Sequence, residues 1–370
     1  MTVAGRSSER VPPDRYLMPI AGLQVPCRWE IGRVALYPGT AGLDLIRDVP
    51  PIGDEGDFFH DGVYELLDSA RESTIAVVPG RSDIDAAIDE LRASLDVLRL
   101  FQLSRQSGHS TSFGLPGDVS ESKIGYIAIW ENSAPGHRLV GDYLGFTFTQ
   151  ASYDDWASSI AFQYLSDSIA DTSPPDGARR AVTGARLLAR AVTEYRSDLK
   201  MLSVMAALEA WLLNRHSGPQ TLRLARHVTW FGCGRPGDNL CGRDRPICAY
   251  LYLSPNKSRD RGRLNSLRDL GNTHLGWRCS EWHQVMDWYD ARSAAAHGAL
   301  NSVDAKHASS AEYCVLHYLM EPILNWLREH PQEPVADLEE VIDAIEEPGG
   351  WEGMIEALDS ELPPAMPPLP

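Results

Sequence analysis

The segment Asp171-Thr-Ser-Pro-Pro-Asp-Gly177 constrains the fold of this 370-residue chain more than any other segment. Two consecutive prolines cannot continue a helix, and the aspartates and the glycine around them favour turns. A chain of this length also exceeds a usual single domain of about 100–200 residues. We therefore predict two domains, with a linker at residues 171–177.

Before the linker, the sequence alternates between strand-like and helical patterns. Short runs rich in β-branched and aromatic residues are bounded by Gly or Pro, as strands are, and apolar residues elsewhere recur at helical spacing. The predicted strands are 33–37, 73–78, 124–130 and 143–148, and the predicted helices are 82–103 and 156–169. We therefore expect a mixed, mainly β domain over residues 15–170, preceded by a loose terminus over residues 1–14.

After the linker, apolar residues recur at intervals of three and four, which predicts helices. The predicted helices are 181–195, 199–213, 280–298 and 310–329. Ser280 is the expected N-cap of the third helix and Gly298 its stop, while Pro322 is expected to bend the fourth. We expect an all-α helical bundle over residues 178–330 with a Cys-containing insertion at 232–250, so that the fold class is α+β.

The net charge of −17 conceals a basic middle segment between acidic flanks. Residues 178–300 carry nineteen Lys and Arg against ten Asp and Glu, a balance of +9, while the rest of the chain sums to −26. Binding to a phosphate backbone needs clustered Lys and Arg, so the middle segment favours a nucleic-acid partner. A solvated helical surface rich in Arg is the alternative interpretation.

Residues 331–370 form an acidic, proline-rich C-terminal tail, with eleven Asp and Glu and no Lys or Arg. The spacing of Val335, Leu338, Ile342 and Ile345 predicts a short amphipathic helix within it. One hypothesis is that the tail mimics phosphate and restrains the basic segment by folding over it. The alternative is a solvated acidic end that aids solubility.

The sequence has no secretory or membrane-spanning pattern. Its amino terminus lacks an apolar stretch of the secretory type, and no run approaches the roughly 18 apolar residues of a membrane helix. We expect a cytoplasmic protein without membrane contact. Its six cysteines are then expected to be reduced thiols or metal ligands rather than disulfides.

Arg292 and His297 lie on the clearest predicted helix, residues 280–298. At about 100° per residue, their side chains lie roughly 140° apart. We expect them to flank the two edges of an apolar stripe, which consists of Trp282, Val285, Met286, Tyr289 and Ala296. If two copies of the stripe meet about a two-fold axis, the Arg and His of both subunits line one shared cleft.

The segment Tyr289-Asp-Ala-Arg-Ser-Ala-Ala-Ala-His-Gly298 resembles the motif of HEPN nucleases, in which four to six residues separate an Arg from a His. It is especially similar to the ApeA-type group. Upstream, residues 204–213 (VMAALEAWLL) are similar to the Leu-Glu-rich helix that opens the helical bundle of this family. Residues 18–23 and the helix near 90–101 are similar to the amino-terminal companion domain of that group.

This resemblance implies RNA cleavage without a metal or cofactor, by attack of the ribose 2′-hydroxyl on the adjacent phosphate. His297 would transfer protons near neutral pH, and Arg292 would bind the phosphate and stabilise the charge of the transition state. Glu209 would orient Arg292, although a surface-facing or structural glutamate is the alternative. Ser293 stands where many catalytic members have Asn, Asp or His, which leaves a non-cleaving, RNA-binding version open.

The resemblance also implies a homodimer that acts as an antiphage or abortive-infection effector. Its substrate would be RNA (tRNA, mRNA or rRNA), and a component of the phage would trigger it. Two other classes of function stay open. One is a non-catalytic sensor that binds RNA, and the other is a helical dimerisation module whose basic surface binds another protein.

Three cysteines in the insertion are candidate zinc ligands, together with nearby histidines and one further cysteine. They are Cys233, Cys241, Cys248, His227, His274 and Cys279. Structural zinc sites usually include a close C-x₂₋₄-C pair, which this segment lacks. The alternative, which we favour, is a set of small buried thiols in an insertion whose arginines contact RNA. We assign no metal to these residues.

Overall fold

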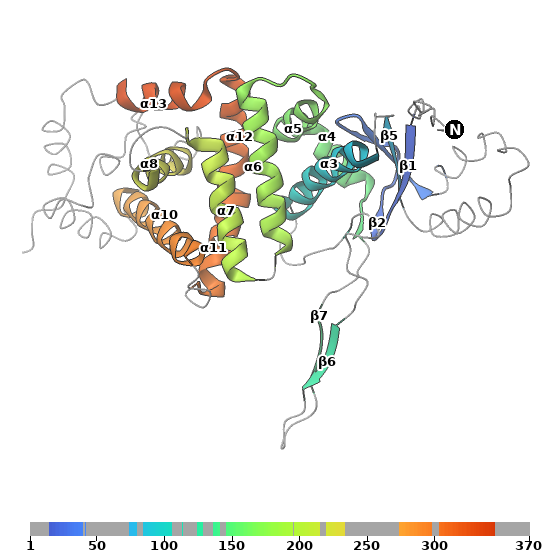
Figure 1. Cartoon of the computed structure of the whole chain (residues 1–370), viewed down its shortest axis with the longest axis horizontal. Coiled ribbons are helices and arrows are strands. Elements are labelled where there is room, and N and C mark those ends of the chain that lie inside the picture. The colour runs from blue at the N-terminus through green and yellow to red at the C-terminus, as the bar shows by residue number, and fades with distance from the viewer. Residues whose placement is uncertain are drawn as a thin grey trace, which may run out of the picture. The chain divides into compact units, whose positions relative to one another are not determined.

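A computed structural model describes a large part of the chain (Figure 1). The described residues are 15–39, 41, 74–79, 84–105, 113, 124–128, 136–140, 146–194, 196–214, 220–233, 274–297 and 303–344. The chain divides into two compact units at the bond between Ser173 and Pro174, which lies inside the segment predicted as a linker. The predicted loose terminus 1–14 lies outside the described residues, as do most of the 232–250 insertion and the end of the tail.

A four-stranded antiparallel sheet forms the centre of the first unit. Its strands, in spatial order, are β1 (Arg15–Ile20), β5 (Thr74–Pro79), β4 (Val34–Tyr37) and β3 (Trp29–Ile31). Ala76 pairs with Met18 on one side and Leu36 on the other, and Leu36 pairs with Trp29. All four side chains are buried, so this row crosses the sheet on its packed face.

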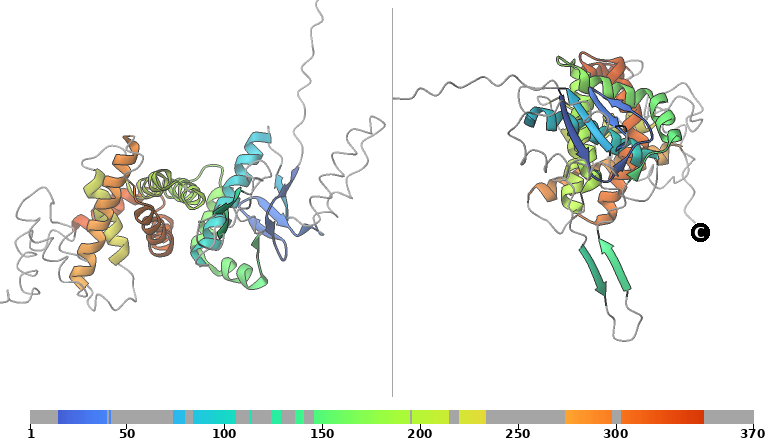
Figure 2. Two further views of the ribbon diagram at one scale, coloured as in Figure 1. Left: turned by 90° about the horizontal axis from the view of Figure 1, so that it is seen from below. Right: turned by 90° about the vertical axis from the view of Figure 1, so that its right-hand side faces the viewer.

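Helix α3 (Ile84–Arg105) lies against this sheet, together with α5 (Ile160–Ala170) (Figure 2). Ser94 of α3 donates a hydrogen bond to the Ile31 carbonyl at 3.1 Å. On the α5 side, Gly32 occupies the first position of the two-residue β3–β4 loop with φ of 62°, and an added Cβ would lie 3.0 Å from Ile169. Glycine therefore suits this turn both by conformation and by space.

The remaining strands of the first unit form two pairs. Strand β2 (Leu23–Gln24) pairs in parallel with β8 (Phe146–Thr147), and β6 (Ile124–Ala128) pairs antiparallel with β7 (Gly136–Val140). The predicted strand 143–148 is confirmed over Phe146–Thr147, and residues 143–145 lie outside the described residues.

The predicted helix 156–169 consists of two helices, α4 (Gln150–Ser158) and α5. Thr149 caps α4 by accepting a hydrogen bond from the Ser152 amide at 3.1 Å. Ser159 has an extended backbone, with φ of −80° and ψ of 112°, and it ends α4 and begins α5. The apolar periodicity does not reveal this single-residue break.

The second unit is helical. Its elements are α6 (Asp176–Thr193), α7 (Ser197–Leu212), α8 (Gln220–Cys233), α10 (His274–Ala296), α11 (Ala305–Cys314), the π-helix η2 (Val315–Leu319), α12 (Met320–Glu329) and α13 (Pro334–Ala344). Helices α6 and α7 run side by side (Figure 1), and α7 also contacts α8, α10 and α11. Helix α7 is thus the central element of this unit, and the α+β class is confirmed in its general form.

The contact between α6 and α7 depends on a glycine. The indole of Trp211 is fully buried and donates to the Ala181 carbonyl at 3.3 Å. A Cβ added to Gly184 would lie 2.1 Å from Nε1 of this indole. Any larger residue at this position would therefore push the two helices apart.

Three predicted helix boundaries in this unit are wrong. Helix α6 begins at Asp176, two residues inside the predicted linker, because Pro175 suits a helix start and Asp176 favours the positive helix end. Helix α10 begins at His274, so Ser280 lies within the helix and is not its N-cap. The fourth predicted helix begins at Ala305 and not at Ser310.

The helix type changes just before Pro322, the residue that was predicted to bend this helix. A π-helical segment, Val315–Leu319, precedes α12, and the Met320 amide donates to the Val315 carbonyl five residues earlier. Pro322 lies in the first turn of α12 and has no N–H to donate to the Tyr318 carbonyl. The wider π turn lies where this donor is missing.

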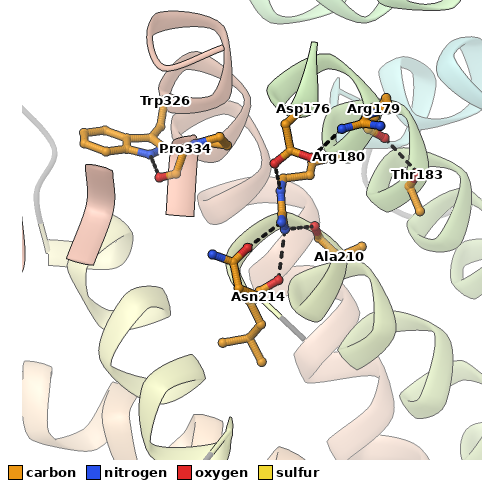
Figure 3. Close-up of polar contacts among 9 residues, drawn as sticks. Asp176, Arg179, Arg180, Thr183, Ala210, Asn214, Trp326 and Pro334 are labelled. Carbon is orange, nitrogen blue, oxygen red and sulfur yellow. Dashed lines mark hydrogen bonds and ion pairs between the residues drawn. The ribbon is translucent and has the colours of Figure 1, made fainter. Parts of the chain in front are cut away.

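Helix α13 confirms the amphipathic helix predicted in the acidic tail. Val335 and Leu338 are buried, and the Pro334 carbonyl accepts a hydrogen bond from the Trp326 indole at 2.8 Å (Figure 3). Asp337 lies 2.9 Å from His330 Nδ1, and Glu339 forms an ion pair with Arg223 of α8. The first part of the tail therefore packs on the helical unit.

Among the described residues, no helix has the length and apolar character needed to cross a membrane.

Candidate functional site

Helix α10 carries the predicted site, but its packed face is not the predicted one. The buried residues are Val285, Trp288 and Ala295, whereas Ala296 is exposed. Met286 and Tyr289 are half-buried, and the side chain of Trp282 lies outside the described residues. The packed face is therefore rotated around the helix relative to the predicted stripe, which did not include the buried Trp288.

Arg292 lies near this packed face and reaches α7. Its Nη2 atom donates to Oε2 of Glu209 at 3.3 Å and lies equally close to Oε1. The guanidinium carbon also lies 5.5 Å from the centre of the Tyr289 ring, within the range of a cation–π contact. The exposed fractions of the Arg292 and Glu209 side chains are 31% and 22%, so the ion pair is only partly open to solvent.

The electrostatics of Glu209 follow from this position. Partial burial raises the pKa of the Glu209 carboxyl, because the charged form loses hydration. The positive charge of Arg292 and its hydrogen bond lower the pKa of Glu209, but they do not cancel the effect of burial. Ionised Glu209 therefore depends on Arg292 as its counter-charge.

His297 lies on a different side of α10. It follows the last residue of the helix, its side chain is exposed, and its amide donates to the Ser293 carbonyl at 3.1 Å. Because this bond continues the helical pattern, His297 lies roughly 140° around the axis from Arg292. The roughly 140° separation is therefore the predicted one, but because the packed face is rotated around the helix, the half-buried Arg292 lies beside this face and the exposed His297 does not.

The three polar side chains have different chemical capacities. Arg292 uses Nη2 for Glu209 in the described contacts, while a guanidinium has five N–H donors in total. The exposed imidazole of His297 is accessible to a ligand in solution. Ser293 is half-buried and lies between them in sequence, and its carbonyl supports the backbone of His297.

The candidate zinc ligands lie mostly outside the described residues. Cys241 and Cys248 are not described, and of Cys233, His274 and Cys279 only the helical backbone is. His227 is described and is 1% exposed, and its Nδ1–H donates to the Leu212 carbonyl at 2.8 Å. This histidine therefore belongs to the packing between α8 and α7, a role that its sequence position near the cysteines did not indicate.

Arg180 of α6 is another residue whose contacts the sequence did not predict. Its guanidinium binds Asp176 and donates to the Ala210 and Leu213 carbonyls at 3.0 and 2.9 Å, and to the Asn214 side chain at 2.6 Å (Figure 3). The spacing of Asp176 and Arg180 is a known signal for a pair on one helix face. The carbonyls of α7 have no such signal in the sequence.

Comparison of the chain with protein family models, with curated proteins and with solved structures gave no match. The resemblance to HEPN nucleases thus stands on the motif around Arg292 and His297 and on the Leu-Glu-rich segment of α7.

Proposed function

We propose that the helical unit is a metal-independent RNA endonuclease of the HEPN type, with Arg292 and His297 as its catalytic residues. The observation that carries the proposal is the ion pair between Arg292 and Glu209, 83 positions apart in the chain. This ion pair holds the partly exposed guanidinium of Arg292 in place on α10, and the exposed His297 follows the last residue of the same helix. The Arg, the His and the Leu-Glu-rich helix of the motif are thus parts of one helical unit.

The chemistry uses only the ribose, the phosphate and these side chains. The 2′-hydroxyl oxygen forms a bond to the adjacent phosphorus, and the bond from phosphorus to the 5′-oxygen breaks. His297 accepts the proton of the 2′-hydroxyl or donates one to the leaving 5′-oxygen. Arg292 stabilises the negative charge that develops on the phosphate oxygens. The products are a 2′,3′-cyclic phosphate and a free 5′-hydroxyl.

A homodimer completes the site in this proposal. Arg292 and His297 lie on different sides of α10, so one chain does not bring them to the same phosphate by itself. If two copies of α10 meet about a two-fold axis, the Arg292 and His297 of both subunits can line one shared cleft. Closed two-fold dimers are the commonest oligomers of soluble proteins.

The biological role that we propose is that of an antiphage or abortive-infection effector in the cytoplasm. It follows from the resemblance to the ApeA-type group and rests on analogy. In this role the amino-terminal unit would respond to a phage-derived trigger, and the basic residues of the 178–300 segment would bind the RNA backbone.

One experiment tests the proposal against its alternatives. The purified full-length chain is incubated with bulk cellular RNA in excess chelator, beside the Arg292→Ala and His297→Ala variants. Loss of cleavage in both variants supports the nuclease. Cleavage by the wild type that survives both substitutions removes Arg292 and His297 from the mechanism.

A non-cleaving RNA-binding protein is the second candidate. Ser293 favours it, because a serine hydroxyl is shorter and a weaker hydrogen-bonding group than the Asn, Asp or His that follows the Arg in many catalytic members. Under this candidate the wild type binds RNA and leaves it intact, and Arg292→Ala weakens the binding. A chain that neither binds nor cuts RNA would instead be a helical dimerisation module.

A further inference from the structure

The last turn of α7 accepts hydrogen bonds from side chains of two other helices, α6 and α8. The final four carbonyls of a helix have no partner within the helix, and they need donors from elsewhere when they are buried. Helix α7 ends at Leu212, and Glu209 lies in its last turn. The position of the Glu209 carboxylate therefore depends on how firmly this turn is held.

Arg180 holds this turn from the side of α6. One nitrogen, Nη1, donates to the carbonyls of both Ala210 and Leu213, at 3.0 and 2.9 Å (Figure 3). The side chain of Arg180 is 17% exposed, and Asp176 of the same helix fixes its direction. A planar guanidinium suits this task because its donors are fixed in one fork.

His227 holds the same turn from the side of α8. Its buried ring donates from Nδ1 to the Leu212 carbonyl at 2.8 Å. Its other nitrogen, Nε2, lies 3.7 Å from Oε1 of Glu339 in α13.

We propose that Arg180 and His227 are positioning residues for the candidate active site, because together they fix the turn of α7 that places Glu209 against Arg292. This inference rests on the proposed function for its catalytic consequence. Three carbonyls at the end of α7, those of Ala210, Leu212 and Leu213, accept hydrogen bonds from these two side chains. With both donors present the turn cannot fray, and the Glu209–Arg292 pair keeps a single geometry.

The test compares variants that keep the volume of each side chain and remove its donors. These are Arg180→Met and His227→Leu, with His227→Gln as the conservative variant because its amide N–H can still reach Leu212. Arg190→Met is the matched control, since Arg190 is an exposed arginine on the same helix α6. Thermal unfolding first establishes which variants are folded.

Two measurements on the folded variants do not depend on RNA cleavage. The Leu213 amide, which donates to the Glu209 carbonyl at 3.0 Å, is expected to exchange with solvent about tenfold faster in Arg180→Met and in His227→Leu. The carboxyl carbon shift of Glu209, followed by NMR against pH, is expected to give a changed pKa for Glu209 in both. His227→Gln and Arg190→Met are expected to match the wild type. Unchanged exchange and an unchanged Glu209 pKa in the two donor-less variants would overturn the inference.

Cleavage kinetics then separate this inference from the proposed function. If Arg292→Ala abolishes cleavage, Arg180→Met and His227→Leu are expected to lower kcat by about tenfold with KM nearly unchanged. An unchanged kcat beside an inactive Arg292→Ala variant contradicts the positioning role alone. If Arg292→Ala cleaves like the wild type, the proposed function fails, and the exchange and pKa measurements still decide whether the turn is held as proposed.

Discussion

Arg292 of α10 donates a hydrogen bond from Nη2 to the carboxylate of Glu209 of α7 at 3.3 Å. This contact connects the two segments that carry the resemblance to HEPN nucleases. It is also a polar contact beside a face of α10 that otherwise packs through the apolar side chains of Val285, Trp288 and Ala295. The predictions below follow from this relationship and from the packing around it.

The Arg292 guanidinium is expected to be needed for cleavage and not only for fold. Arg292→Ala is expected to lower the cleavage rate by about 10²- to 10³-fold, as for removal of one donor that stabilises transition-state charge. Arg292→Lys keeps the charge but not the planar fork, so an intermediate rate is expected. Single-turnover cleavage of a defined RNA measures both. A lysine variant as slow as the alanine variant would show that charge alone contributes nothing.

His297 is exposed, so its replacement is expected to change activity with little change in stability. His297→Ala is expected to slow cleavage by about 10²- to 10⁴-fold, the usual contribution of a general acid or base. Its free energy of unfolding is expected to stay within about 0.5 kcal/mol of the wild type, as for most surface substitutions. His307, an exposed histidine on α11, gives the matched control His307→Ala, which is expected to retain full activity. Equal loss of activity in the two variants would argue against a specific role for His297.

The raised pKa of Glu209 predicts a pH dependence of stability. A carboxyl whose pKa is higher in the folded than in the unfolded chain favours folding below its unfolded pKa of about 4.3. This contribution is lost as the pH rises through the folded-state pKa of Glu209. The free energy of unfolding of the wild type minus that of Glu209→Gln is therefore expected to fall as pH rises over this window. Urea unfolding at a series of pH values measures the difference, and a difference that grows with pH would contradict the burial effect.

Gly184 is expected to be intolerant of even one added carbon. Its Cβ would lie 2.1 Å from the Trp211 indole, so Gly184→Ala is expected to cost about 1–3 kcal/mol or more in the free energy of unfolding. The same substitution is expected to cost much less when Trp211 is already replaced by Leu. Urea unfolding of the two single variants and the double variant gives this coupling. Additive effects would mean that the helices do not meet at this position.

Leu338 provides a test of whether the acidic tail packs. Leu338 is fully buried, so Leu338→Ala is expected to lower the free energy of unfolding by about 2–5 kcal/mol. Glu340, an exposed residue of the same helix, gives the control Glu340→Ala, for which little change is expected. Thermal unfolding compares the two. If Leu338→Ala behaves like Glu340→Ala, α13 is not docked on the helical unit in solution.

Local sequence patterns predicted which helices and strands form better than they predicted how these elements pack. The prolines at 174 and 175 predicted the region where the two units separate, and apolar periodicity predicted α3, α6, α7 and α10. The break at Ser159 and the early start of α10 left no trace in that periodicity. Such boundaries depend on tertiary packing, which overrides weak local preferences.

The polar contacts divide in a similar way. The contact of Glu209 with Arg292 was a hypothesis that came from the resemblance, and the structure brings these side chains together. The hydrogen bonds from Arg180 and His227 to the end of α7 could not be predicted, because these acceptors are main-chain carbonyls. Every residue has such a carbonyl, so the sequence does not indicate which one a distant donor will reach.

The chemical ends of a cleaved RNA test the central claim most directly. A defined RNA is cut by the wild-type chain in excess chelator, and the ends are mapped beside the Arg292→Ala and His297→Ala variants. The account predicts 2′,3′-cyclic phosphate and 5′-hydroxyl ends, which disappear in both variants. Ends with a 3′-hydroxyl and a 5′-phosphate, or cyclic phosphate ends that persist in either variant, would contradict it.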